Sequence, residues 1–183
     1  MDQRPVVLSL GDAAAAILGR IGPRLPRGPR LVSCTYDMRL EQSDVSGDLS
    51  WGVLRLRFHH VVPLEGTLQA LDRAMAPATR LYVIVGLGGV SGSAWIKAVA
   101  SFPFLNLDLQ MVHCMTPFSF EGAKKKRNTE EALAHLRATE TPHRVHAIQD
   151  LMIDAAPDQT FTQAFERIDT AIIEAITRQE HHG

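Results

Sequence analysis

A glycine-rich segment between an apolar run and a predicted helix is the part of the sequence best suited to chemistry. Residues Val85–Lys97 read VGLGGVSGSAWIK. Glycines placed between a buried strand and a helix let backbone N–H groups converge on an anion, and Ser91 and Ser93 add hydroxyl donors. The spacing fits neither a Walker loop nor a GxGxxG fingerprint. It therefore indicates either a phosphate-binding loop or a tight, closely packed turn between strand and helix.

A second motif follows the next apolar run, where Thr116–Gly122 reads TPFSFEG and a basic stretch, Lys124–Arg127, comes after it. Taken alone, so short a basic stretch is typical of a solvated helix surface. Gly89–Ser93 reads GVSGS and lacks the last glycine of a GxSxG elbow. The histidines share no ligand spacing with cysteines or carboxylates. We therefore expect no hydrolase-type catalytic residue and no metal site.

Strands and helices must alternate along the chain to position these motifs. Asp12 stands just before the first predicted helix and is expected to cap it. Residues 51–58 alternate as an edge or half-exposed strand does, whereas residues 41–50 are polar and rich in turn formers. The predicted strands are 4–10, 31–35, 51–58, 81–85, 107–115 and 144–148, and the predicted helices are 13–20, 64–75, 93–100, a helix after Gly122 that ends at Leu136, and 160–177.

Interior strands that are apolar throughout predict an α/β fold with three layers, in which helices cover both faces of a mostly parallel, Rossmann-like sheet. We expect one domain over residues 1–183. Ligands of such sheets bind at the carboxyl ends of the strands. The loops after Leu10, Thr35, Val85 and Met115 are therefore where a site is expected.

The composition is that of an ordinary globular protein, with 45% hydrophobic and 21% charged residues. The 19 Lys and Arg against 20 Asp and Glu leave no net field to attract nucleic acid or an anionic membrane surface. Cys34 and Cys114 lie in apolar runs without CxxC spacing, which predicts buried thiols in a reducing compartment. With no signal peptide pattern and no long apolar span, a cytoplasmic protein without a membrane partner is expected.

The two motifs together resemble FtsZ, a member of the tubulin/FtsZ superfamily. That family carries a GGGTGTG signature after a buried strand and then a KPFxFEG segment that opens the next helix. PFSFEG matches the second closely, the glycine loop matches the first in part, and coarser similarity extends from Val6 to about Ile176. The resemblance implies GTP or GDP as ligand, with Mg²⁺. It also implies a full-length FtsZ-like protein or a second copy as partner, and a role in cell division or the cytoskeleton.

The resemblance also implies roles for particular residues. Glu121 and Lys125 match the ribose contacts, and Phe165 and Asp169 match the pair that holds the guanine. Core packing is the alternative role for Phe165. The phosphate contacts of the family match Gly11, Gly88, Gly89, Ser91, Gly92 and Ser93.

Departures from the family pattern leave two functions open. Val90 and Ala94 replace signature glycines, and the side chain of Val90 opposes the close backbone approach that glycine permits. After Gly11 the first loop continues with Asp12, whose negative charge disfavours phosphate unless a metal intervenes, and Ala16 stands where the family has an asparagine. The chain is therefore expected to be either a nucleotide-binding domain or a scaffold that binds protein partners without nucleotide.

The family's hydrolysis also needs an acidic loop that follows the long last helix. This sequence ends at Gly183, directly after the corresponding predicted helix. We therefore expect no GTP hydrolysis by the family mechanism from the chain alone. A role in capping or regulating a full-length relative is the corresponding expectation.

Overall fold

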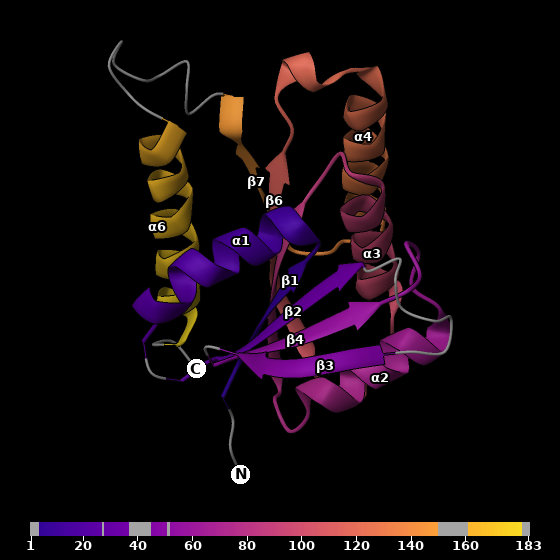
Figure 1. Ribbon diagram of the computed structural model, residues 1–183, viewed down its shortest axis with the longest axis vertical. Helices are drawn as coiled ribbons and strands as arrows, with labels where there is room; N and C mark the ends of the chain where they lie inside the picture. The colour runs from indigo at the N-terminus through magenta and orange to yellow at the C-terminus, as the bar shows by residue number, and fades with distance from the viewer. Residues whose placement is uncertain (1–3, 27, 37–44, 51, 150–160, 181–183) are drawn as a thin grey trace.

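The structure is a computed structural model that describes residues 4–26, 28–36, 45–50, 52–149 and 161–180. Within these residues, a seven-stranded sheet is covered by helices on both faces (Figure 1). This confirms the predicted three-layer α/β architecture.

The sheet has the strand order β3-β4-β2-β1-β5-β6-β7. All neighbouring strands run parallel except β3 and β4, which are antiparallel. β1, at the centre, and β5 beside it are buried along almost their whole length, as expected for strands covered on both faces. The strands are β1 Val6–Leu10, β2 Arg30–Tyr36, β3 Val45–Ser50, β4 Val53–Phe58, β5 Arg80–Gly86, β6 Asp108–Thr116 and β7 His143–Ala147.

Two hydrophobic clusters, one on each face of the sheet, hold the helices in place. Helices α2 (Glu65–Met75), α3 (Val90–Ser101) and α4 (Ala123–Ala138) contribute to the first cluster. Helices α1 (Asp12–Ile21) and α6 (Phe161–Glu180) contribute to the second. Figure 1 shows the two groups on opposite sides of the sheet. Short 3₁₀ turns, η1 (Gly22–Arg24) and η2 (Ser119–Glu121), complete the described elements.

Helix α6 owes its place to a stripe of isoleucines. Ile168, Ile172 and Ile176 recur every four residues, so they share one helix face. All three are almost fully buried, in the same cluster as Ile17 and Leu18 of α1. The two helices at opposite ends of the chain are thereby brought into contact.

The structure differs from the sequence-based expectation in one segment. Residues 41–50 were expected to be polar loop, but Val45–Ser50 forms β3. It pairs with β4 along its full length, from Val45 opposite Phe58 to Ser50 opposite Val53. β4 therefore has neighbours on both sides and is half exposed but not an edge strand. Trp51, in the expected strand, lies outside the described residues.

Candidate functional site

A pocket of about 310 Å³ lies at the carboxyl edge of the sheet, where β1, β5 and β6 end. Its volume is at the lower end of the range for small-molecule sites. The loops that follow these three strands line it, as the fold class predicts. Of the residues matched to the nucleotide site, the structure brings six together there: Gly11, Gly89, Ser91, Gly92, Glu121 and Lys125.

The first turns of α1 and α3 both begin at this pocket. Gly11 is the N-cap of α1 and Gly89 is the N-cap of α3, and neither helix start receives a side-chain capping hydrogen bond. Backbone N–H groups at a helix start favour an anion, because they need acceptors and carry the positive end of the helix dipole. The pocket therefore offers two helix starts suited to phosphate.

The expectation that Asp12 caps α1 is wrong. The helix begins at Asp12 itself, one residue after the N-cap position from which a side chain can reach the free N–H groups. Gly11 takes the N-cap position with φ 86°, a conformation that suits glycine. Asp12 is exposed and lines the pocket instead.

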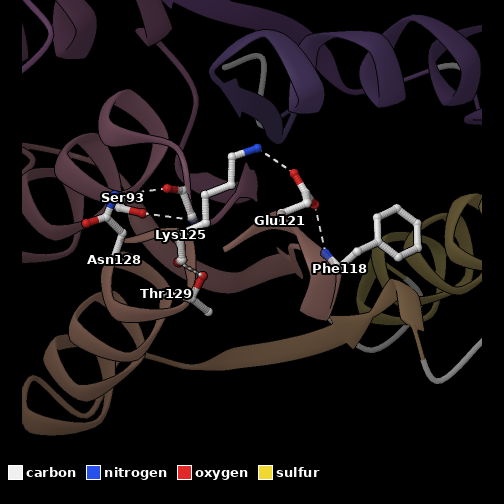
Figure 2. A network of polar contacts seen from close by, with 7 residues as sticks. Ser93, Phe118, Glu121, Lys125, Asn128 and Thr129 are labelled. Carbon is white, nitrogen blue, oxygen red and sulfur yellow. Dashed lines mark hydrogen bonds and ion pairs between the residues drawn. The ribbon is translucent and has the colours of Figure 1, made fainter. Parts of the chain in front are cut away.

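Gly88 and Ser93 brace the glycine loop from inside. The N–H of Gly88 donates to Ser93 Oγ at 3.2 Å, and Asn128 Nδ2 donates to the Gly88 carbonyl at 2.9 Å. The bond from Asn128 joins the loop to α4, and the bond to Ser93 joins it to the first turn of α3 (Figure 2). Ser93 is 3% exposed, and neither it nor Gly88 is among the described residues that line the pocket. The hydrogen bonds of Gly88 and Ser93 hold the loop in shape, whereas Gly89, Ser91 and Gly92 line the pocket.

The same loop packs very closely on the end of β5. A Cβ atom added to Gly92 would lie 2.3 Å from the carbonyl oxygen of Gly86. The sequence left open whether this segment is a phosphate-binding loop or a tight, closely packed turn, and the close packing is present. It does not exclude the other, because Gly89, Ser91 and Gly92 also line the pocket.

Glu121 and Lys125 form an ion pair at the pocket wall (Figure 2). Glu121 Oε1 also accepts a hydrogen bond from the Phe118 N–H at 2.7 Å. The hydrogen bond from Lys125, followed by the one from the Phe118 backbone, holds the pKa of Glu121 below its usual value. The pocket therefore presents an ionised carboxylate beside an ammonium group, two groups that can bind the hydroxyls and the phosphates of a nucleotide.

Val90 and Ala16, two departures from the family pattern, take different positions. Val90 is the first residue of α3, lines the pocket and is 51% exposed. Its side chain therefore occupies pocket surface that a glycine would leave free. Ala16 lines a separate cavity of about 300 Å³ between α1 and the strands β2 and β4, together with Thr35 and Arg55.

The residues matched to the guanine contacts lie on α6 and are already in contact with another side chain. The two carboxylate oxygens of Asp169 accept hydrogen bonds from Arg20 Nε at 2.8 Å and Arg20 Nη2 at 2.9 Å. The Arg20 guanidinium carbon lies 5.3 Å from the ring centroid of Phe165. Neither Phe165 nor Asp169 is among the described residues that line the pocket.

Sequence reasoning had not singled out Arg20. The residue lies 149 positions from Asp169, and no local pattern connects an arginine near the end of α1 with a carboxylate on α6. The nearest signal was Asp169 itself, a charged residue beside the apolar stripe of α6, which required a partner if buried.

Within the described residues, no three His, Cys, Asp or Glu side chains gather in a way that would hold a metal ion. None of the described helices has the length and the apolar character needed to cross a membrane.

The fold is similar to those of several solved FtsZ-like structures. The FtsZ dimer of M. jannaschii, described as empty, has a TM-score of 0.68 at 17% identity over 96% of this chain and 54% of that chain. CetZ from Methanosaeta thermophila has a TM-score of 0.65 at 16% identity over 98% of this chain and 54% of that chain. TubZ of Bacillus thuringiensis serovar israelensis, solved as GDP-form protofilaments, has a TM-score of 0.64 at 11% identity over 93% and 52% of the two chains.

No family model and no curated protein sequence matches this chain. The chain spans about half the length of the solved chains that it resembles. At these low identities the likeness concerns the arrangement of the backbone. Together with the parallel sheet and the pocket at its carboxyl edge, it shows that this chain has the tubulin/FtsZ-like α/β fold.

Proposed function

We propose that this chain binds a guanine nucleotide, GTP or GDP, as an FtsZ-like nucleotide-binding domain. The observation that carries the proposal is the pocket into which α1 and α3 direct their first turns, with Lys125 on its wall. Two helix starts and an ammonium group favour a di- or triphosphate. Glu121 lines the same pocket, and its lowered pKa keeps it ionised, which suits the hydroxyls of a ribose.

The donor set of the pocket also fits Mg²⁺ delivered with the nucleotide. Proteins often bind this ion through one or two carboxylates, with phosphate oxygens and water completing its shell. Asp12 lines the pocket beside the phosphate-binding turns and is the carboxylate that would hold the ion. An Mg²⁺ ion would offset the repulsion between Asp12 and the phosphates.

Calorimetric titration with GDP, with and without Mg²⁺, tests the proposal. Binding should be measurable and tighter with Mg²⁺, and Lys125→Ala should weaken it about tenfold, the equivalent of about 1.4 kcal/mol. Lys126→Ala is the matched control, because Lys126 is 79% exposed and its ion pair with Glu130 lies outside the pocket lining. The absence of binding heat, together with no guanine nucleotide released from the denatured purified protein, would overturn the proposal.

The second candidate function is a scaffold that binds protein partners and no nucleotide. Val90, half exposed in the pocket, and the engaged Arg20–Asp169 pair favour it. A ligand that binds the folded state alone must raise its stability. A clear rise in melting temperature with GDP would therefore contradict the scaffold, whereas an unchanged melting temperature would support it.

The proposed partner is a full-length FtsZ-like protein or a second copy of this chain. Similar folds were solved as GTPγS-bound protofilaments of CetZ2 and as GDP-form protofilaments of TubZ. Head-to-tail assembly joins two different surfaces, so a domain that supplies one of them binds a polymer end and regulates its growth. Co-sedimentation with a polymerising FtsZ-like protein tests this role, and an unchanged polymer mass at equimolar addition would refute it.

A further inference from the structure

Arg20 and Asp169 form a fork-to-fork contact between α1 and α6. Two nitrogens of one planar guanidinium face the two oxygens of one carboxylate, at 2.8 Å and 2.9 Å. The guanidinium carbon of Arg20 also lies over the ring of Phe165, 5.3 Å from its centroid. Asp169 and Phe165 are one helical turn apart on α6, so both act on the same side of that helix.

This pair of residues recognises a particular chemical shape. The carboxylate accepts two parallel N–H groups attached to one planar carbon, and the ring takes the flat face of the same group. Guanine offers the same arrangement, because its N1–H and its exocyclic amino group flank one ring carbon. Adenine has no adjacent N–H pair of this kind on its pairing edge. The fragment that Asp169 would read in guanine is therefore a guanidine, which is the group that Arg20 carries.

Arg20 and Asp169 are unequally exposed. The side chain of Asp169 is 2% exposed, whereas that of Arg20 is 42% exposed. Arg20 therefore covers the carboxylate from the solvent side and has room to swing away, whereas Asp169 is fixed in the packed face of α6. A ligand that binds Asp169 must displace the guanidinium of Arg20 and replace its two hydrogen bonds.

We propose that Arg20 occupies the guanine subsite of this protein and competes with the base for Asp169 and Phe165. This inference rests on the proposed nucleotide binding. With Arg20 in place, a nucleotide is held by its phosphates and ribose only, and the protein does not discriminate between bases. Removal of Arg20 opens the subsite and confers a preference for guanine.

Calorimetric titrations of GDP and ADP into four proteins test the proposal: the wild type, Arg20→Ala, Arg20→Lys and Arg24→Ala. Arg24 is the matched control, since it is also near the end of α1 and reaches α6, but through a single 3.4 Å contact with Thr170. The wild type and Arg24→Ala should bind GDP and ADP with the same affinity. Arg20→Ala should bind GDP about tenfold more tightly than the wild type, with the affinity for ADP unchanged, because occupancy of a subsite lowers apparent affinity.

Arg20→Lys keeps a positive charge near Asp169 but lacks the planar fork. It serves as the folded variant if Arg20→Ala does not fold, and should also bind GDP more tightly than the wild type. Two results overturn the proposal: a wild type that prefers GDP over ADP about tenfold, or Arg20 variants whose affinity for GDP is unchanged or weaker.

Guanosine and adenosine separate this inference from the proposed function, because they carry no phosphate. Guanosine should raise the melting temperature of the Arg20 variants, but not that of the wild type or of Arg24→Ala, and adenosine should raise none. If GDP fails to bind the wild type but guanosine stabilises the Arg20 variants, the proposed nucleotide function fails and the role of Arg20 stands. If guanosine does not distinguish the Arg20 variants from the wild type, the role of Arg20 is refuted, whatever GDP does.

Discussion

Gly92 of α3 lies against the backbone of Gly86 at the end of β5, so closely that a Cβ atom on Gly92 would be 2.3 Å from the Gly86 carbonyl oxygen. Backbone atoms cannot rotate away as a flexible side chain can. The start of α3, which forms one wall of the pocket, can therefore lie this close to β5 only because residue 92 has no side chain.

Gly92→Ala should lower the free energy of unfolding by about 1–3 kcal/mol, the usual cost of forcing an extra carbon into a packed region. The sign is informative, because a glycine-to-alanine change inside a helix otherwise stabilises by up to about 1 kcal/mol. Urea denaturation checks it. Gly19→Ala, inside α1, is the control: a Cβ there meets nothing within 4 Å, so alanine should raise the free energy of unfolding by up to about 1 kcal/mol. Equal stability of both variants would refute the close contact.

Arg20→Ala should also destabilise the protein, apart from any effect on ligands. Asp169 is 1% exposed, and removal of Arg20 leaves its carboxylate without the two hydrogen bonds that satisfy it. Since an unsatisfied buried polar group costs about 1–3 kcal/mol, we expect a loss in that range. Arg24→Ala, which removes one exposed 3.4 Å contact, should change stability by less than about 0.5 kcal/mol. A double-mutant cycle with Asp169→Asn measures the coupling, and a coupling near zero would contradict the ion pair.

His113 and His146 predict that the protein loses stability in mild acid. The two rings stack with Nδ1 of His113 3.0 Å from Nε2 of His146, and both residues are buried. The pKa of His113 is lowered from 6.5 to about 3, mainly by burial and then by the charges of His146 and Arg144. The pKa of His146 is lowered from 6.5 to about 4, mainly by burial and then by the charge of Arg144. Below pH 6.5 these two histidines are protonated in the unfolded chain but stay neutral in the folded protein. The free energy of unfolding therefore falls as the pH falls.

Between pH 6.5 and 4 the loss attributable to His146 should be on the order of 2–3 kcal/mol, since each pKa unit is worth about 1.4 kcal/mol. Denaturation curves recorded across this pH range measure it. His146→Gln removes a titrating ring and should flatten the dependence. His135→Gln, which changes a partly exposed ring bonded to Ser101, should leave the dependence as it is. If the wild type is equally stable at pH 6.5 and pH 4, the conclusion that His113 and His146 are buried in the neutral form is refuted.

The two cysteines should be inert in the folded protein. Both are buried, and burial raises the pKa of the Cys34 thiol and raises that of Cys114 to about 12. The reactive thiolate is therefore scarce at neutral pH. A thiol reagent such as DTNB should react with neither cysteine in the native protein and with both in denaturant. Rapid labelling of the native protein would contradict the buried positions.

Much of the fold was predictable because it depends on short-range patterns. The runs at Val6–Leu10 and at residues 81–85 are largely apolar and each is followed by glycine, which indicates buried strands. The stripe of α6 recurs at the helical period and predicts a buried face. β3 was missed because a polar segment such as Val45–Ser50 becomes a strand through backbone pairing with β4, which no local pattern records.

The candidate site was predictable in part for the same reason. A glycine loop after a buried strand must lie at the carboxyl edge of the sheet, so the position of Gly89, Ser91 and Gly92 follows from the sequence and the fold class. The roles of the individual residues within the loop do not follow from the sequence. Ser91 lines the pocket, whereas Ser93 is buried and accepts a hydrogen bond from the Gly88 N–H, and nothing in the local sequence distinguishes these two serines.

The sequence by itself determined the order of the elements other than β3, the mostly parallel sheet and the edge at which a ligand would bind, because hydrophobic period and glycine placement act over a few residues. The tertiary structure alone decided which side chains meet across the chain. Arg20 and Asp169 are 149 positions apart, and their contact exists because the apolar faces of α1 and α6 pack together on one side of the sheet. His113 and His146 likewise meet only because β6 and β7 pair. Such contacts depend on packing over the whole domain, which local periodicity does not encode.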